Sequence, residues 1–161
     1  MKQVLITAIL ALITQAADAQ DKDAAATQKI VESRNFVFRA QTASSQRGRV
    51  QQLTSEYDLS IKRDSIVSWL PFFGRAYTAP INNTEGGIKF TSTDFSYSPR
   101  KGKKESWEIN IKPNDVQEVQ SLYLRVYANG TASLQVTSTN RDMMSFNGYI
   151  KESPEPGKKA F

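Results

Sequence analysis

The sequence predicts an all-β domain, mainly antiparallel sheet, with a short helix near its N-terminus. Three observations lead to this fold class. Apolar residues recur at every second position in about eight short runs, residues that favour turns separate these runs, and one early segment alone has a helical pattern. Eight sequential strands with short connections form a barrel or a sandwich, and the sequence does not choose between the two.

The elements are expected in the following order. Residues 20–34 are polar and rich in alanine, which predicts a short helix or a flexible lead. Residues 35–151 form the antiparallel β domain, and residues 152–161, with two prolines and a glycine, form a disordered tail. The expected strands are Phe36–Ala40, Tyr57–Ile61, Ile66–Leu70, Ile88–Tyr97, Ser106–Lys112, Leu122–Tyr127, Ala132–Ser138 and Ser145–Ile150. Asn129-Gly130 is the strongest hairpin signal, because both residues tolerate a positive φ.

Residues 1–19 have the pattern of a signal peptide. Lys2 supplies the positive start, Val4 to Ile13 is mostly apolar, and Ala17-Asp18-Ala19 fits a cleavage site. We therefore expect an exported protein, periplasmic or extracellular. The apolar run is too short to span a bilayer, so we expect no transmembrane anchor after signal cleavage. The absence of Cys predicts that the protein is not lipid-anchored.

The composition excludes several kinds of chemistry. The chain has no Cys and no His, which removes thiol nucleophiles, Cys/His zinc sites, haem ligation by His and every Ser-His or Cys-His triad. Phosphate-loop and dinucleotide patterns are absent, and no Asp-rich loop has the spacing of calcium ligands. We expect no cofactor, no metal and no catalytic residue, so the sequence leans away from an enzyme.

Paired carboxylates are the one catalytic alternative that this composition leaves open. Glycoside hydrolysis needs only two opposed acidic side chains. The candidates are Asp94, Glu105, Glu108 and Asp142. Glu105 and Glu108 differ by three positions and would point to opposite faces of a strand, so only Asp94 and Asp142 could converge.

The chain is basic, with a net charge of +5, and its cations cluster locally. Arg100, Lys101, Lys103 and Lys104 fall within five positions, at a place where Pro99 and Gly102 predict a hairpin tip. Such a tip could meet an anionic group or serve solubility alone. Nucleic acid is not an expected partner, because no recognition motif is present.

The densest group of aromatic residues lies between positions 69 and 77. Pro71 removes a backbone donor and Gly74 permits a bend, so the strand should end or bulge here. Aromatic rings beside an arginine suit a recognition surface, particularly one for sugar rings. In the alternative, two phenylalanines close one end of the core and the arginine pairs with a carboxylate. The candidate ligand-binding residues are Trp69, Phe72, Phe73, Arg75 and Tyr77.

This segment also resembles a known family. The matching residues are, in order, Leu70 and Pro71–Tyr77, then Gly86–Phe90, Asn129–Ser138, Asn140-Arg141 and Ser145–Gly148. They resemble the exported family of Gram-negative gut bacteria catalogued as domain of unknown function 4251. The resemblance covers roughly Ile30 to Ile150. It implies an exported single-domain protein and carries no established activity, cofactor or catalytic residue.

Two smaller signals accompany these motifs. Asp64-Ser65-Ile66 resembles a short acceptor for O-glycosylation of exported proteins in some Gram-negative gut bacteria, and it lies at an expected turn. Arg141 could act as a functional cation, or it could cap carbonyl groups or pair with an acid.

The function that these observations favour is a non-catalytic binding or interaction module of the cell envelope. Its expected partner is an envelope glycan or another envelope protein. The alternatives are a carboxylate-dependent enzyme that acts on glycans, and a structural partner that presents a sheet edge in an assembly.

Overall fold

The computed structural model describes residues 23–46, 48, 50–77 and 86–153. The expected signal peptide, residues 1–19, and nearly all of the expected tail lie outside these residues. Within the described part of the chain, nine strands form one antiparallel sheet in the order β4-β3-β2-β1-β9-β8-β7-β6-β5. The strands are β1 (Phe36–Ser45), β2 (Gln51–Ile61), β3 (Ile66–Pro71), β4 (Gly87–Ser92), β5 (Phe95–Lys101), β6 (Ser106–Pro113), β7 (Val119–Tyr127), β8 (Thr131–Ser138) and β9 (Met144–Glu152).

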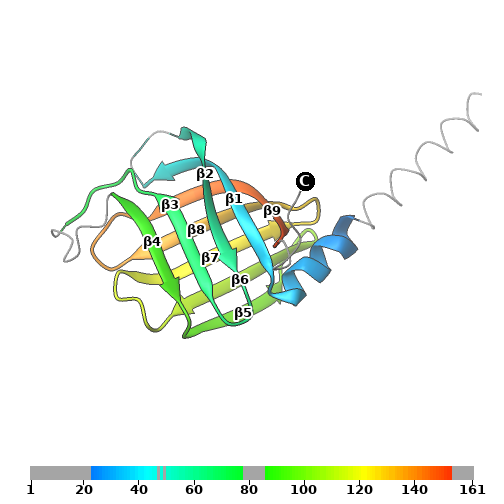
Figure 1. The fold of residues 1–161 in the computed structure, drawn as a ribbon. Helices are drawn as coiled ribbons and strands as arrows, with labels where there is room; N and C mark the ends of the chain where they lie inside the picture. The colour runs from blue at the N-terminus through cyan, green and yellow to red at the C-terminus, as the bar shows by residue number, and fades with distance from the viewer. Residues whose placement is uncertain (1–22, 47, 49, 78–85, 154–161) are drawn as a thin grey trace, which may run out of the picture.

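The sheet curls into a nearly closed barrel. The first strand pairs with the last, and β1–β4 cross over β5–β9 at a steep angle (Figure 1). The two edges of the sheet, β4 and β5, do not pair with each other. The all-β antiparallel fold predicted from the sequence is confirmed, and the barrel is the arrangement adopted.

The barrel interior is filled by one apolar core. Alternate residues of each strand point inward, as period-two patterning requires, and many have no exposed surface at all. The largest fully buried side chains include Phe36, Phe38, Phe146, Leu59, Leu122 and Leu134.

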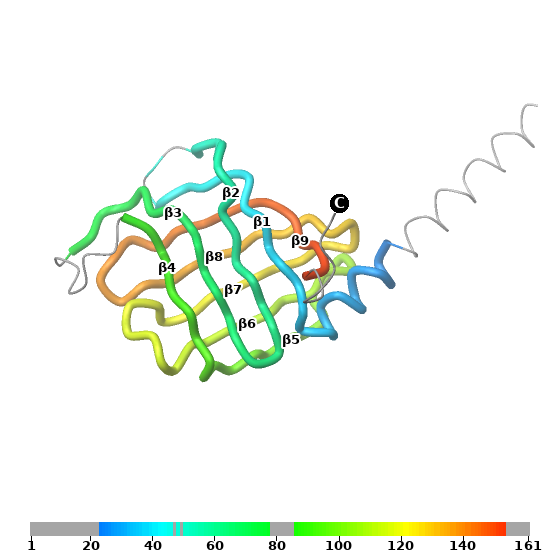
Figure 2. Tube along the Cα trace, in the orientation of Figure 1, coloured from blue at the N-terminus to red at the C-terminus, as the bar shows by residue number. Residues whose placement is uncertain are grey.

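A helix over residues 23–33 covers the end of the barrel where β1 begins (Figure 2). Val31, 1% exposed, belongs to the core. Thr27 Oγ1 donates to the carbonyl of Ala128 at 2.8 Å, and the Tyr97 hydroxyl donates to the carbonyl of Val31 at 3.0 Å. Burial raises the pKa of Tyr97. Of the helix and the flexible lead predicted for this segment, the structure shows the helix.

The sequence predicts one strand over Ile88–Tyr97, and the structure divides it into β4 and β5. The break falls at Thr93 and Asp94, the corner where the chain passes from one edge strand of the sheet to the other. The Asp115 carboxylate holds this corner: it accepts hydrogen bonds from the backbone N–H of Thr93 at 2.8 Å, from that of Asp94 at 3.2 Å and from the Ser92 hydroxyl. The carboxylate comes from the connection between β6 and β7, so no local signal marks the corner.

These hydrogen bonds make stability depend on pH in the acidic range. They favour the ionised form, with the Ser92 hydroxyl contributing most, and lower the pKa of Asp115 from 3.8 to about 2. The unfolded chain therefore binds this proton more readily, and the stabilisation is lost as pH falls from about 4 through about 2. We expect Asp115→Asn to weaken the rise in free energy of unfolding between pH 2 and pH 4, measured by urea titration.

The control for that experiment is Asp64→Asn, which removes a carboxylate from the exposed turn between β2 and β3. If Asp115→Asn and Asp64→Asn left the same pH slope, the corner would not depend on the Asp115 carboxylate.

Candidate functional site

The aromatic segment leaves the sheet at the end of β3, on the opposite end of the barrel from the helix. At Pro71, β3 pairs only with β4, so the missing N–H of proline leaves no break in the ladder toward β2. Three residues later, a Cβ at Gly74 would lie 2.8 Å from the Cβ of Asp142 and 2.9 Å from the Phe72 ring. Glycine therefore lets this segment contact the connection between β8 and β9.

Asp142 joins the two segments. Its carboxylate accepts a hydrogen bond from the Arg75 backbone N–H at 3.0 Å and another from the Tyr77 hydroxyl. Its own N–H donates to the carbonyl of Arg75 at 2.9 Å, and the Tyr77 N–H donates to the carbonyl of Asn140 at 2.9 Å. Residues 75–77 are thus held by backbone and side-chain hydrogen bonds together.

Arg141 completes this bracing from the buried side. Its guanidinium donates to the carbonyl of Gly87 at 3.0 Å, lies 3.4 Å from a carboxylate oxygen of Glu118, and stacks 5.4 Å from the centre of the Phe72 ring. The side chain is 11% exposed. The sequence left two roles open for Arg141: a functional cation, or a residue that caps carbonyl groups or pairs with an acid. The structure shows the second role.

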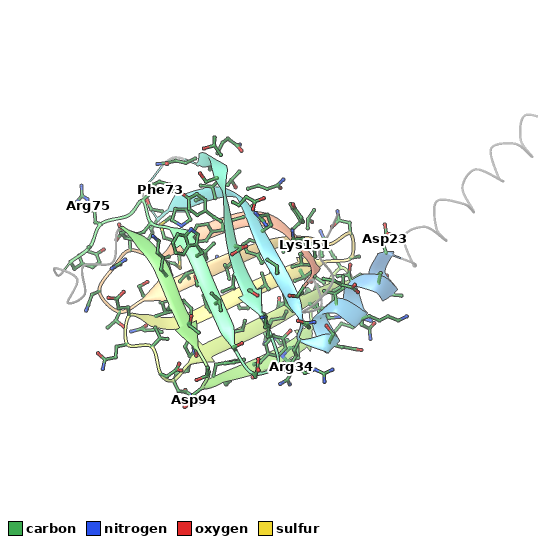
Figure 3. All side chains as sticks on the ribbon, viewed as in Figure 1. Asp23, Arg34, Phe73, Arg75, Asp94 and Lys151 are labelled. Atoms are coloured by element: carbon green, nitrogen blue, oxygen red, sulfur yellow. The ribbon has the colours of Figure 1, made fainter. Side chains whose placement is uncertain are left out.

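The five predicted binding residues fall into two groups. Phe72 is half-buried and packs against the core, so the alternative role of closing the barrel end applies to this ring alone. Trp69 is 51% exposed, Phe73 42% and Tyr77 69%, and Arg75 is also exposed. Figure 3 shows Phe73 and Arg75 at the same edge of the barrel, with the Arg75 side chain pointing away from it.

Lys89 belongs to this group, and the sequence interpretation missed it. It is paired with Trp69 across β3 and β4, and its Nζ lies 3.9 Å from the centre of the Trp69 ring. Twenty positions separate the two residues, so only the strand register could have revealed the contact. We call Trp69, Phe73, Tyr77 and Lys89 the aromatic surface.

The candidate carboxylates do not form a catalytic pair. Asp94 lies two positions after the end of β4 and accepts from the Asn114 amide at 2.9 Å, whereas Arg141, next to Asp142, contacts the first residue of β4. A six-residue strand spans roughly 17 Å, and glycoside hydrolysis requires about 5 to 10 Å between the two carboxyl groups. Glu108 lies between the guanidinium groups of Arg100 and Arg125, at 2.7 and 2.8 Å. Asp94 and Asp142, the pair for which the sequence left convergence open, therefore lie near opposite ends of β4.

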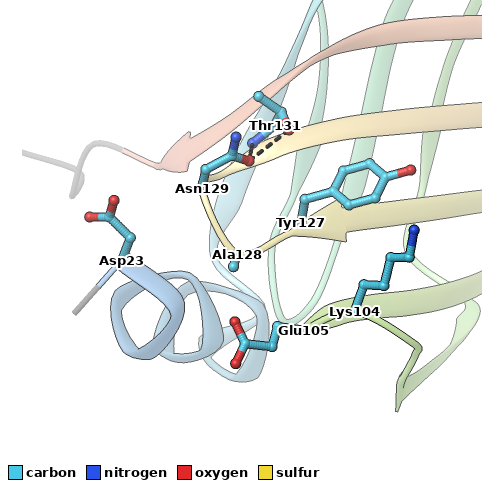
Figure 4. Close-up of a pocket in the computed structure, with 7 residues that line it drawn as sticks. All are labelled: Asp23, Lys104, Glu105, Tyr127, Ala128, Asn129 and Thr131. Atoms are coloured by element: carbon cyan, nitrogen blue, oxygen red, sulfur yellow. Dashed lines mark hydrogen bonds between the residues drawn. The ribbon is translucent and has the colours of Figure 1, made fainter. Parts of the chain in front are cut away.

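A hollow of about 430 Å³ lies at the other end of the barrel, beside the helix (Figure 4). Lys104 and Glu105, in the hairpin between β5 and β6, contribute to it. Their φ values are positive, at 54° and 49°, a backbone conformation that is strained in residues other than glycine. Its remaining lining residues are Asp23, Tyr127, Ala128, Asn129 and Thr131. The charges of Lys104 and of the two carboxylates oppose each other, so the hollow does not define a class of ligand.

Metal sites and membrane-spanning helices are both absent from the described residues. Among residues 23–46, 48, 50–77 and 86–153, no three acidic side chains gather as a metal site would require. In the same part of the chain, no helix is long and apolar enough to cross a bilayer.

Fold and site together define a small antiparallel β-barrel domain with an exposed, braced aromatic surface on its outside. The chain belongs to the family described as Domain of unknown function (DUF4251), whose model matches residues 18–150. The crystal structure of a DUF4251 family protein from Bacteroides eggerthii is similar in fold, with a TM-score of 0.57 and 14% sequence identity over 83% of this chain and 88% of that one. None of the curated proteins compared with the chain matches it.

Proposed function

We propose that this protein is an exported, non-catalytic binding module whose aromatic surface takes a glycan of the cell envelope. One observation carries the proposal: Trp69, Phe73 and Tyr77 are 51%, 42% and 69% exposed. They lie on a strand and on a segment held in place by Asp142. Large exposed aromatic side chains that gather in one place commonly mark a binding surface. A braced segment loses little conformational entropy when it binds.

The chemistry of the aromatic surface favours carbohydrate. A sugar ring has an apolar face that stacks on an aromatic ring and hydroxyl groups that need polar partners. Here the polar groups are adjacent to the rings: the Lys89 ammonium lies beside Trp69, and the Asp142 carboxylate accepts from Tyr77. Binding sites of this kind combine aromatic area with a few polar groups that fix orientation.

Export and the absence of catalysis complete the proposal. Export is supported by the signal pattern in residues 1–19, which delivers the domain to a compartment that contains envelope glycans. The non-catalytic role is supported by a sequence without Cys or His and by the separation of Asp94 from Asp142 along β4.

Thermal unfolding of the purified protein tests the proposal. The probes are neutral chito-, malto-, manno- and xylo-oligosaccharides, acidic oligogalacturonides, and peptidoglycan fragments. A ligand at 100 times its Kd adds about 2.7 kcal/mol to the free energy of unfolding, which raises the Tm by several degrees. We expect at least one of these glycans to produce such a shift.

Substitutions then locate the site. Trp69→Ala and Phe73→Ala should each weaken binding by about tenfold or more, because truncating an aromatic anchor typically costs over 1 kcal/mol. The matched control is Tyr127→Ala, which removes a ring that is 39% exposed on β7, away from the aromatic surface. No Tm shift with any glycan, or equal affinities in all three variants and the wild type, would overturn the proposal.

A further inference from the structure

A row of outward-facing residues crosses six adjacent strands at a single level of the barrel. Strand register pairs each member with the next, from β4 through β3, β2, β1 and β9 to β8. The row consists of Lys89, Trp69, Asp58, Arg39, Tyr149 and Thr131. Neighbouring strands lie about 4.8 Å apart, so Trp69 and Tyr149, three strands from each other, are separated by about 14 Å. Both rings are solvent-accessible, at 51% and 38% exposure.

The floor between the two rings is a fixed ion network. Arg39 lies 2.9 Å from a carboxylate oxygen of Glu56 and 3.8 Å from one of Asp58, and its side chain is only 15% exposed. The hydrogen bond from Arg39 lowers the pKa of Glu56, so this carboxylate is ionised at neutral pH. The cation is thus enclosed, while Glu56, with 86% of its side chain exposed, presents acceptor oxygens to solvent.

Lys89 determines which side of Trp69 can receive a ligand. Its ammonium, which comes from β4, occupies one face of the ring. A second ring can therefore stack only on the other face, and from Trp69 the row continues to Asp58 on β2 and, beyond it, to Tyr149. In that direction the row runs from the edge strand β4 toward the middle of the sheet.

We propose that this row binds an extended, neutral oligosaccharide that lies across the strands, with one sugar ring on Trp69 and a later ring on Tyr149. The inference rests on the proposed function and adds the charge, the minimum length and the direction of the ligand. A neutral ligand fits because the exposed acceptors between the rings are the carboxylates of Glu56 and Asp58, which accept hydrogen bonds from hydroxyl groups and repel anionic sugars, while the nearest cations, Arg39 and Lys151, already interact with Glu56. Two anchors joined by one ligand bind more tightly than either alone, so affinity must grow with chain length until both are engaged.

The test measures affinity for the neutral oligosaccharide ladders named above, from one to four units, by isothermal titration calorimetry. In the wild type we expect at least about a tenfold gain from the shortest to the longest member. Tyr149→Ala should abolish that gain and leave the affinity for the single sugar unchanged. Trp69→Ala should weaken binding of every member, and oligogalacturonides should bind at least tenfold more weakly than neutral chains of equal length.

The control is Tyr127→Ala, since Tyr127 is 39% exposed against 38% for Tyr149 and lies two strands beyond it, on β7. Equal length dependence in Tyr149→Ala and Tyr127→Ala, or preference for the acidic chains, would overturn this inference while the proposed function stood. Absence of binding by every neutral ladder in the wild type would overturn this inference, and the proposed function would fall with it only if the oligogalacturonides and peptidoglycan fragments also failed to bind.

Discussion

Gly148→Ala is expected to destabilise the barrel by more than about 3 kcal/mol, enough to lower the Tm by roughly 10 °C or to prevent folding. A Cβ at this position would lie 1.9 Å from the carbonyl oxygen of Arg39 and 2.9 Å from its carbonyl carbon. Both are backbone atoms of the paired strand β1, so a side-chain rotation cannot relieve the contact. β1 and β9 would have to separate where the sheet closes.

The position of Gly148 explains why the space is so small. It faces Ala40, at the point where the register of β1 shifts before Thr42. A register shift bends the strand and brings the two backbones together. The same residue ends the segment Ser145–Gly148 that carries the family resemblance, so packing accounts for its presence there.

The control for this prediction is Gly86→Ala. Nothing lies within 4 Å of a Cβ at Gly86, and the φ of +45° leaves only backbone strain, worth about 1 to 2 kcal/mol. Denaturant titration of both variants separates steric overlap from strain. A Gly148→Ala protein as stable as Gly86→Ala would show that β1 and β9 can move apart at little cost.

Phe146→Ala is the second variant with a large expected effect, a loss of about 3 to 5 kcal/mol. Phe146 has no exposed surface and lies on β9 between Ala43 of β1 and Leu134 of β8. Removing the ring leaves a cavity at the junction of the two halves of the barrel, which the surrounding β-strands cannot collapse to fill. Thermal and urea unfolding measure the loss.

Phe73→Ala provides the matched comparison, because Phe73 is 42% exposed. Its substitution should change the free energy of unfolding by less than about 1 kcal/mol while weakening glycan binding. The two phenylalanines therefore separate folding from recognition. If Phe73→Ala cost as much stability as Phe146→Ala, the aromatic surface would be part of the core.

Alternation of apolar residues was sufficient to predict most of the fold. Tyr57, Leu59 and Ile61 repeat at every second position and belong to a strand, and Asn129-Gly130 forms the predicted turn, with Gly130 at a φ of +79°. The corner at Thr93 was missed because Asp115, more than twenty positions away, creates it. Long-range hydrogen bonds of this kind leave no periodic trace in a sequence.

The candidate site divides in the same way. Trp69, Phe73 and Tyr77 could be selected from composition, because large rings beside Pro71 and Gly74 do not fit a regular strand. Lys89, Asp58 and Tyr149 could not be selected in this way, because each joins the row that contains Trp69 only through the pairing of strands far apart in the sequence. Predicting them requires the register of four ladders, and a shift of one residue would turn each side chain to the opposite face.

Pairing of the first strand with the last also determines how the domain can be attached to something else. Phe36 lies opposite Glu152, and the Ser153 N–H donates to the carbonyl of Asn35 at 3.3 Å, so the chain enters and leaves the barrel at neighbouring points. The segment of residues 72–77, which follows β3, lies at the other end (Figure 1). A tether or a fused partner at either terminus would therefore hold the domain by its helix-covered end and leave the residues around Tyr77 directed outward.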